Sequence, residues 1–184
     1  MENIINKVLV VYFSKYGSTK KYAKWIAEEL SGDIYSINNF KENILNNYGV
    51  IIIGSGLYAG NIRGINIIIK NYEILKSKKI VLFTCGLADY DKIENINSIN
   101  KRLEKKIPKN IKDTIKIYYL RGGINYKKLS LKHKIMMGLL KMVTMKKGLK
   151  KINEEDKEFI ETYGQKIDFT DKNNIKGIIE YCKK

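Results

Sequence analysis

A loop rich in hydroxyl side chains follows the first apolar run of the chain, residues 8–13. Its members, all candidate cofactor contacts, are Ser14, Lys15, Tyr16, Gly17, Ser18 and Thr19. The serine and threonine hydroxyls can donate hydrogen bonds to an anion, and Gly17 lets the backbone curl closely around it. The pattern predicts a phosphate-binding loop. The competing interpretation is an ordinary turn in which Ser18 or Thr19 merely caps the next helix.

That helix is indicated by apolar residues at helical spacing, namely Tyr22, Ala23, Ile26, Ala27 and Leu30. A helix start leaves backbone N–H groups without partners, and the helix dipole adds positive potential there. The loop lacks the Gly-Lys-Ser/Thr ending of a Walker motif and the Gly-x-Gly-x-x-Gly dinucleotide fingerprint. A single phosphate, as on a mononucleotide, is therefore the better match.

Composition limits the class of protein. The length of 184 residues predicts a single domain over residues 1–184, and two cysteines offer no disulfide framework. The lone His133 argues against a histidine-based metal site, so we expect no metal. No apolar run approaches a membrane span and the first residues do not resemble a signal peptide, so we expect a cytoplasmic protein.

Charge points to anionic partners without choosing among them. The chain has 35 Lys and Arg against 19 Asp and Glu, a formal net charge of +16. Arginine is scarce, and in the basic segment 126–151 aromatic residues do not alternate with the lysines, so nucleic-acid binding is disfavoured. The sequence leaves the oligomeric state open.

Apolar runs and amphipathic stretches alternate along most of the chain. Alternation with short connections predicts an α/β fold, a parallel sheet covered by helices on both sides. The expected strands are 8–13, 33–37, 49–54, 79–85 and 115–120, the last being the final strand. The expected helices between them are 65–75 and 93–106, the second stopped by Pro108.

Two further loops are expected at the same edge as the first, because parallel strands place their carboxyl ends together. The second loop holds Ser55, Gly56, Leu57, Tyr58, Ala59 and Gly60, and the third holds Thr84, Cys85, Gly86, Leu87, Ala88, Asp89 and Tyr90. A flat ring beside Tyr58, with its phosphate in the first loop, suits flavin mononucleotide (FMN). Each of three residues in the third loop has an alternative to cofactor binding. Tyr90 could cover a helix end, Asp89 could cap a helix, and Cys85 could be an inert core thiol.

Residues 124–151 form a basic, methionine-rich insertion. Tyr126 to Lys151 holds nine lysines and no acidic residue. A helical stripe is formed by Leu131, Ile135, Leu139, Met142 and Val143. The stripe packs on the sheet edge, or docks on an anionic membrane, or roofs the flavin site and admits an apolar substrate or quinone. We expect His133 to be a solvated surface residue, and Arg121 to meet a substrate carboxylate or to be a surface arginine.

These loops resemble the flavodoxin family over most of the chain. Ser14, Gly17 and Thr19 match the family's phosphate loop, whereas Tyr16 departs from its middle threonine. The resemblance implies a sheet of strand order 2-1-3-4-5, bound FMN, Tyr58 beside the flavin ring, and 86–90 at its pyrimidine edge. It also implies a peptide that reorients on reduction, for which Ala59-Gly60 is the candidate.

A closer resemblance is to the menaquinone-dependent protoporphyrinogen oxidases of heme biosynthesis. It rests on the run 120–126, the basic helix ending near Lys147-Gly148, and Phe169-Thr170-Asp171 before the last helix. It implies electron transfer from an apolar or porphyrinogen-like donor through FMN to a quinone, on the inner face of the cell membrane. The alternative is a flavodoxin carrier between redox proteins, although such carriers are usually acidic. A response-regulator receiver is disfavoured, because Ser14, Lys15 and Gly54 stand where it needs carboxylates.

Overall fold

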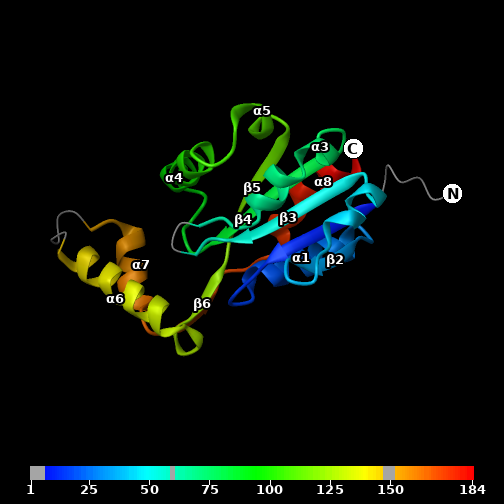
Figure 1. The fold of residues 1–184 in the computed structure, drawn as a ribbon. Helices are drawn as coiled ribbons and strands as arrows, with labels where there is room; N and C mark the ends of the chain where they lie inside the picture. Colours follow the sequence, from blue (N-terminus) through cyan, green and yellow to red (C-terminus); the bar gives the residue numbers. More distant parts are fainter. Residues whose placement is uncertain (1–6, 59–60, 147–151) are drawn as a thin grey trace.

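The centre of the molecule is a five-stranded parallel sheet. The computed structural model describes residues 7–58, 61–146 and 152–184. Its strands are β1 (Val8–Phe13), β2 (Asp33–Ser36), β3 (Val50–Gly56), β4 (Lys79–Gly86) and β5 (Ile115–Arg121). Their spatial order is β2-β1-β3-β4-β5, with all pairs parallel (Figure 1). The predicted fold class and strand order are confirmed.

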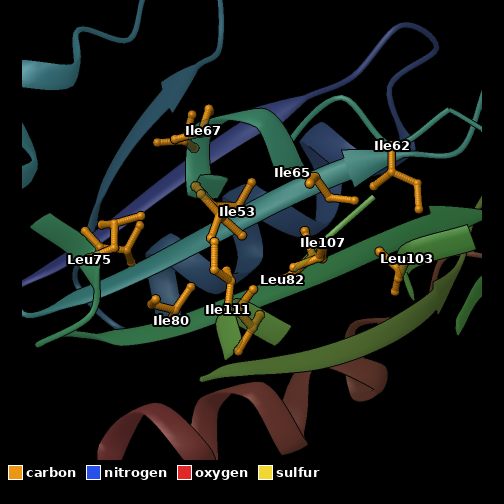
Figure 2. Close-up of a cluster of buried hydrophobic side chains, with 14 of the residues drawn as sticks. Ile53, Ile62, Ile65, Ile67, Leu75, Ile80, Leu82, Leu103, Ile107 and Ile111 are labelled. Carbon is orange, nitrogen blue, oxygen red and sulfur yellow. The ribbon is translucent and has the colours of Figure 1, made fainter. Parts of the chain in front are cut away.

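The central strands are continuous apolar runs because both faces of the sheet are covered. Successive side chains point to opposite faces, so Ile53 belongs to one core and Ile52 to the other. Figure 2 shows the first core, in which Ile53 and Leu82 of the sheet meet Ile65 and Leu103 from the helices on that side. The two cores hold the sheet rigidly and so fix the positions of its carboxyl ends.

Helices on the first face are α2 (Ile65–Lys70), α3 (Tyr72–Leu75), α4 (Ile93–Glu104) and α5 (Lys109–Lys112), with the 3-10 turn η2 (Glu42–Asn47) beside them. The second face is covered by α1 (Ser18–Glu29), the turn η5 (Lys172–Ile175) and α8 (Lys176–Lys183). The single helix predicted over 65–75 is broken at Asn71. The side-chain amide of Asn71 donates to the Ile67 carbonyl, which lets the backbone leave helical geometry there.

Two strands are longer than predicted. β3 continues through Ser55 to Gly56 and β4 ends at Gly86, so residues placed in loops belong to the sheet. Residues 55 and 56 pair with 84 and 85, and these ladder hydrogen bonds hold them extended despite the glycines. The cofactor loops therefore begin only at Leu57 and Leu87.

After β5 the chain adds a small appendage that contains two short strands as well as helices. β6 (Gly123–Asn125) and β7 (Lys166–Asp168) pair antiparallel, so the prediction that 115–120 is the final strand was wrong. Between them lie the turn η3 (Tyr126–Lys128) and two helices, α6 (Leu131–Lys146) and α7 (Glu154–Thr162). Figure 1 shows α6 and α7 side by side beyond the carboxyl end of the sheet. Residues 147–151 of the predicted insertion lie outside the described residues.

Candidate functional site

The loop after β1 opens α1 in a conformation that leaves the helix start bare. Gly17 is the N-terminal boundary residue, with φ of 106°, and no described side chain caps the helix. The prediction that Ser18 or Thr19 caps it was wrong, because both lie inside the first turn. Gly17 is exposed, and nothing lies within 4 Å of where a Cβ would be. The dipole of a 12-residue helix therefore faces open space, as an anion site requires.

The segment after β5 lies directly against this helix start. The backbone N–H of Gly123 donates to Ser18 Oγ over 3.0 Å. A Cβ on Gly122 would stand 2.8 Å from Cys85 Sγ and 3.2 Å from Ser18 Cβ, so only glycine fits. The Gly122-Gly123 pair is thus a wall of the site that the sequence analysis did not include.

Lysines gather on the outer side of the same loop. A hollow of about 160 Å³ is bounded by Gly17 and Ser18 on one side and by Lys21, Lys128 and Lys166 on the other. All three lysines are exposed, and Lys21 Nζ lies 3.0 Å from Asp168 Oδ2 in an ion pair. The lysines come from three distant segments, which is why no local pattern revealed them. They add positive potential to the helix start.

The three predicted loops converge at one edge of the sheet, since Phe13 pairs with Ser55 and Ser55 with Thr84. They enclose a cavity of about 120 Å³. The predicted site residues that line it are Tyr16, Ser18, Thr19, Leu57, Tyr58, Cys85, Gly86 and Leu87. The residues that sequence reasoning missed are Gly122, Gly123, Ile124, Leu129, His133, Met136 and Met137. All of the missed residues come from the appendage and its connection to β5.

The other predicted site residues lie around this cavity without lining it. Ser14 Oγ accepts from the Gly17 N–H over 3.1 Å and so shapes the turn. Ser55 Oγ accepts from the Gly64 N–H, and Asp89 Oδ1 accepts from the Asp91 N–H. The rest are Lys15, Gly17, Gly56, Thr84, Ala88 and Tyr90. Ala59 and Gly60, with the peptide expected to reorient, lie outside the described residues.

An aromatic cluster joins the phosphate loop to α6. The Tyr16 hydroxyl is 2.5 Å from His133 Nδ1, and it accepts from the Ser130 N–H over 3.3 Å. The rings of Tyr58 and His133 are parallel to within 7°, with centroids 6.1 Å apart. The Lys15 N–H donates to the Tyr58 hydroxyl over 2.7 Å. The expectation that His133 is a solvated surface residue was wrong, because the course of the chain returns α6 over the loop.

Comparison with known families decides the class of this site. The family described as "Flavodoxin domain" matches residues 9–153, most of the chain, including the phosphate loop and the carboxyl ends of β3 and β4. The chain belongs to the flavodoxin domain family. FMN is therefore the cofactor implied for this flavodoxin-domain protein.

Individual relatives are distant. A 55-residue segment is 46% identical to an uncharacterized protein of Methanocaldococcus jannaschii, and the match spans 29% of this chain and 37% of that relative. Among solved structures, oxidised flavodoxin 2 of Bacillus cereus is 20% identical, covering 62% of this chain and 85% of its own, with a TM-score of 0.38. A flavodoxin from the domain Archaea is 15% identical over 61% and 84% of the two chains, with a TM-score of 0.38.

Two unsatisfied polar groups lie near the sheet edge. The hydroxyls of Thr84 and Tyr90 are buried and have no hydrogen-bond partner among the residues that the structure describes. Neither residue lines the cofactor cavity, so a ring in that cavity would not reach these hydroxyls. The fit to FMN rests on the bare helix start behind Gly17 for the phosphate and on the cavity beside Tyr58 for the ring.

Burial sets the protonation of the groups around the cavity. Burial raises the pKa of the Cys85 thiol to about 12, so the thiol is protonated at neutral pH. Burial, with help from nearby Lys15 and Lys132, lowers the pKa of His133. The imidazole is therefore neutral at pH 7, and only one of its ring nitrogens carries a proton. The cavity is lined by neutral groups, which suits a ring more than a second charged moiety.

A second hollow of about 360 Å³ lies between α6 and α7. Apolar side chains form most of it, and they include Leu140, Val143, Phe159 and Phe169. Arg121 lies at one end, with its guanidinium 3.7 Å from the ring centre of Phe169 and its Nη2 2.5 Å from Glu158 Oε2. Arg121 thus differs from both expectations, because its charge is already paired and it is only partly exposed. This apolar groove shares Leu87, Ile124 and Met137 with the cofactor cavity.

The orientation of α6 also differs from one expectation. The helix does not pack its stripe of residues 131, 135, 139, 142 and 143 on the sheet edge, since these side chains are exposed. Its other side contributes His133, Met136 and Met137 to the cofactor cavity. The position of α6 over the cavity agrees with the interpretation of this helix as a roof. No helix within the described ranges is long and apolar enough to cross a bilayer.

Proposed function

We propose that this protein is an FMN-dependent oxidoreductase that passes electrons from an apolar, porphyrinogen-like donor to a quinone. The observation that carries the proposal is the apolar groove beside the cofactor cavity, which shares three lining residues with it. A groove of this kind is what a bulky ring compound needs in order to lie near a flavin. FMN, when bound, supplies the hydride and single-electron chemistry.

The residues of the chain would position the two ligands and exclude water. Ser18, Thr19 and the start of α1 would hold the phosphate, and Tyr58 would contact the ring. Met136 and Met137 roof the cavity with flexible apolar side chains, which adapt to ring substrates of different outline. Because this roof would exclude water, the electrostatic interactions beneath it would be stronger.

The groove itself favours ligands with little charge. Arg121, the one cation among the described residues that line the groove, is paired with Glu158, and Glu155 accepts from the Asn95 side chain over 3.0 Å. An uncompensated carboxylate entering between Leu140, Val143 and Phe159 would lose its hydration for no paired charge. A neutral quinone or the apolar face of a tetrapyrrole is compatible with this lining.

Turnover of the FMN-loaded protein with protoporphyrinogen and a menaquinone analogue, without oxygen, tests the proposal. Val143→Trp fills the groove, and Ile135→Trp is the control on the outward face of the same helix. We expect kcat/KM to fall by about tenfold or more in the first variant alone, with the Kd for FMN unchanged in both. Equal turnover in both variants would contradict the assignment of the groove.

The second candidate is a non-catalytic electron carrier between redox proteins, which membership of the flavodoxin family favours. The same preparation separates the two functions. A carrier would show no quinone reduction dependent on protoporphyrinogen, yet its reduced flavin would be reoxidised rapidly by a redox protein. The formal net charge of +16 favours an acidic partner for such a carrier.

A further inference from the structure

Helix α6 is apolar on two opposite sides. One side faces the molecule, where Met137 lines both hollows and Thr144 is only 3% exposed. The other side presents side chains that are 53 to 75% exposed, namely Leu131, Ile135, Leu139, Met142 and Met145. Positions 131, 135, 139 and 142 recur at one face of a helix. The molecule buries only one of these two apolar faces.

A helix that is apolar all round is normally buried all round. Within the described part of the chain, the outer face of α6 is left open to solvent. Exposed apolar residues gathered in one patch mark an interaction surface more often than an accident of composition. The outer face is therefore a candidate interaction surface.

Charge identifies the partner. Lys132 and Lys134 flank the outer face at one end and Lys146 lies at the other, all exposed. Residues 126–151 contain no acidic side chain, and the α7 carboxylates nearest α6, those of Glu155, Asp156 and Glu158, line the groove on its inner side. The lysines therefore dominate the potential at the outer face. Lysine stems extend along apolar surface while the ammonium groups remain in water, as at a lipid headgroup boundary.

We propose that the outer face of α6 docks on an anionic lipid surface, with the helix lying in the plane of the interface. Sixteen residues give the helix a length of roughly 24 Å, enough to seat several apolar side chains at one depth. A second copy of this chain is disfavoured, because pairing of two such faces would bring two lysine-rich segments together without a carboxylate between them. The inference does not depend on the proposed redox activity.

Flotation of the full-length, FMN-loaded protein with vesicles tests this proposal. We expect binding to vesicles that contain phosphatidylglycerol, little binding to pure phosphatidylcholine, and a loss of about tenfold in affinity when salt rises from 0.1 to 0.5 M. Failure to float with anionic vesicles at low salt would overturn the proposal. So would equal binding to both kinds of vesicle.

Paired substitutions identify the surface. Leu131→Ser with Leu139→Ser should weaken vesicle binding by about tenfold or more, whereas Ile93→Ser, at an equally exposed isoleucine of α4, should not. Lys132→Gln with Lys134→Gln should act likewise, against the control Lys101→Gln with Lys105→Gln on and beside α4. FMN absorbance of each variant shows that the cofactor site is intact, so loss of docking is distinguished from loss of the flavin function.

Sedimentation in the absence of lipid supplies the remaining outcome. A monomer that still floats with anionic vesicles supports lipid docking. A dimer that the Leu131→Ser, Leu139→Ser variant abolishes would assign the outer face to a second copy and overturn the proposal. Vesicle binding unchanged by both the leucine and the lysine substitutions would also overturn it.

Discussion

The Tyr16 hydroxyl and His133 Nδ1 lie 2.5 Å apart, although the two residues are 117 positions apart in the chain. The contact links the phosphate loop to the first turn of α6. The same hydroxyl accepts from the Ser130 N–H, so one side chain fixes the start of the roof helix. These contacts explain why the phosphate loop contains Tyr16 at a position where flavodoxins have a small hydroxyl residue.

Replacement of Tyr16 by phenylalanine should loosen α6 without unfolding the sheet. The variant loses the hydroxyl and with it the hydrogen bonds to His133 Nδ1 and to the N–H of Ser130, each worth about 1 kcal/mol, as well as a longer contact to Ser130 Oγ. Amide hydrogen exchange over residues 131–137 should therefore speed up about fivefold or more. Tyr72→Phe is the matched control, because its hydroxyl bonds to the Asn110 carbonyl far from α6. Equal exchange of α6 in both variants would show that Tyr16 does not hold the roof.

Acid should loosen the same contact. Because the pKa of His133 is lowered in the folded protein, protonation favours states in which α6 has left the loop. The stabilising contribution of neutral His133 is present above the ordinary histidine pKa and is lost as pH falls through its lowered value. Protection factors of α6, corrected for intrinsic exchange, should decline from pH 7 toward pH 5. They should stay flat in His133→Gln, and a decline of the same size in that variant would exclude His133 as the cause.

Gly17→Ala should weaken FMN binding more than an equally strained substitution elsewhere. A φ of 106° is unfavourable for alanine, at a cost of about 1 to 2 kcal/mol. Gly164 has φ of 87° and also has open space around it, so Gly164→Ala is the control. Chemical denaturation should show similar losses of stability in both variants. Titration with FMN should show about a tenfold weaker Kd for Gly17→Ala only, and similar Kd values would contradict the phosphate assignment.

Cys85 should be unreactive although it lines the cofactor cavity. With a pKa of about 12, about one thiol in 10,000 is ionised at pH 8, and only the thiolate attacks thiol reagents. Cys182, with a pKa of about 11, should also react slowly. A disulfide reagent at pH 8 should therefore label the native protein over hours and the denatured protein at once. Rapid native labelling that Cys85→Ala abolishes would contradict this expectation.

Removal of Phe83 should destabilise the sheet itself. Its ring is fully buried and fills the space beside Gly54, where a Cβ would meet it at 2.2 Å. Phe83→Ala should lower the free energy of unfolding by about 3 to 5 kcal/mol, measured by urea denaturation. A loss below about 1 kcal/mol would mean that the core between β3 and β4 can collapse to fill the gap.

The sheet could be predicted because its strands are buried on both faces and read as unbroken apolar runs. Residues 8–13 and 50–53 are examples in which composition alone indicates the structure. β6 and β7 could not be found in this way, since each has three residues and no periodic pattern. Gly56 and Gly86 were predicted to lie in loops, yet ladder hydrogen bonds to neighbouring strands decide their conformation.

The site was partly predictable for a similar reason. The first three loops follow strands whose order can be inferred, so their convergence follows from topology. His133, Met136 and Met137 enter the site because α6 packs on α7 and returns across the sheet edge. A histidine among lysines gives no local signal of that path. Two indirect indications were available in the sequence: the departure of Tyr16 from the flavodoxin pattern, and the interpretation of the methionine-rich helix as a roof over the flavin site.

The bond from Gly123 to Ser18 Oγ gives the appendage and the first turn of α1 a common anchor. A ligand that orders the first turn of α1 should therefore also order β6, the strand that leads into α6 and α7. Conversely, a change in the position of α6 and α7 should alter the geometry of that turn. Thermodynamic coupling is reciprocal: if ligand binding at α1 stabilises one position of the appendage, that position of the appendage strengthens ligand binding by the same free energy. Ser18, which lies at the predicted anion site, thus also connects α1 to the appendage that follows β5.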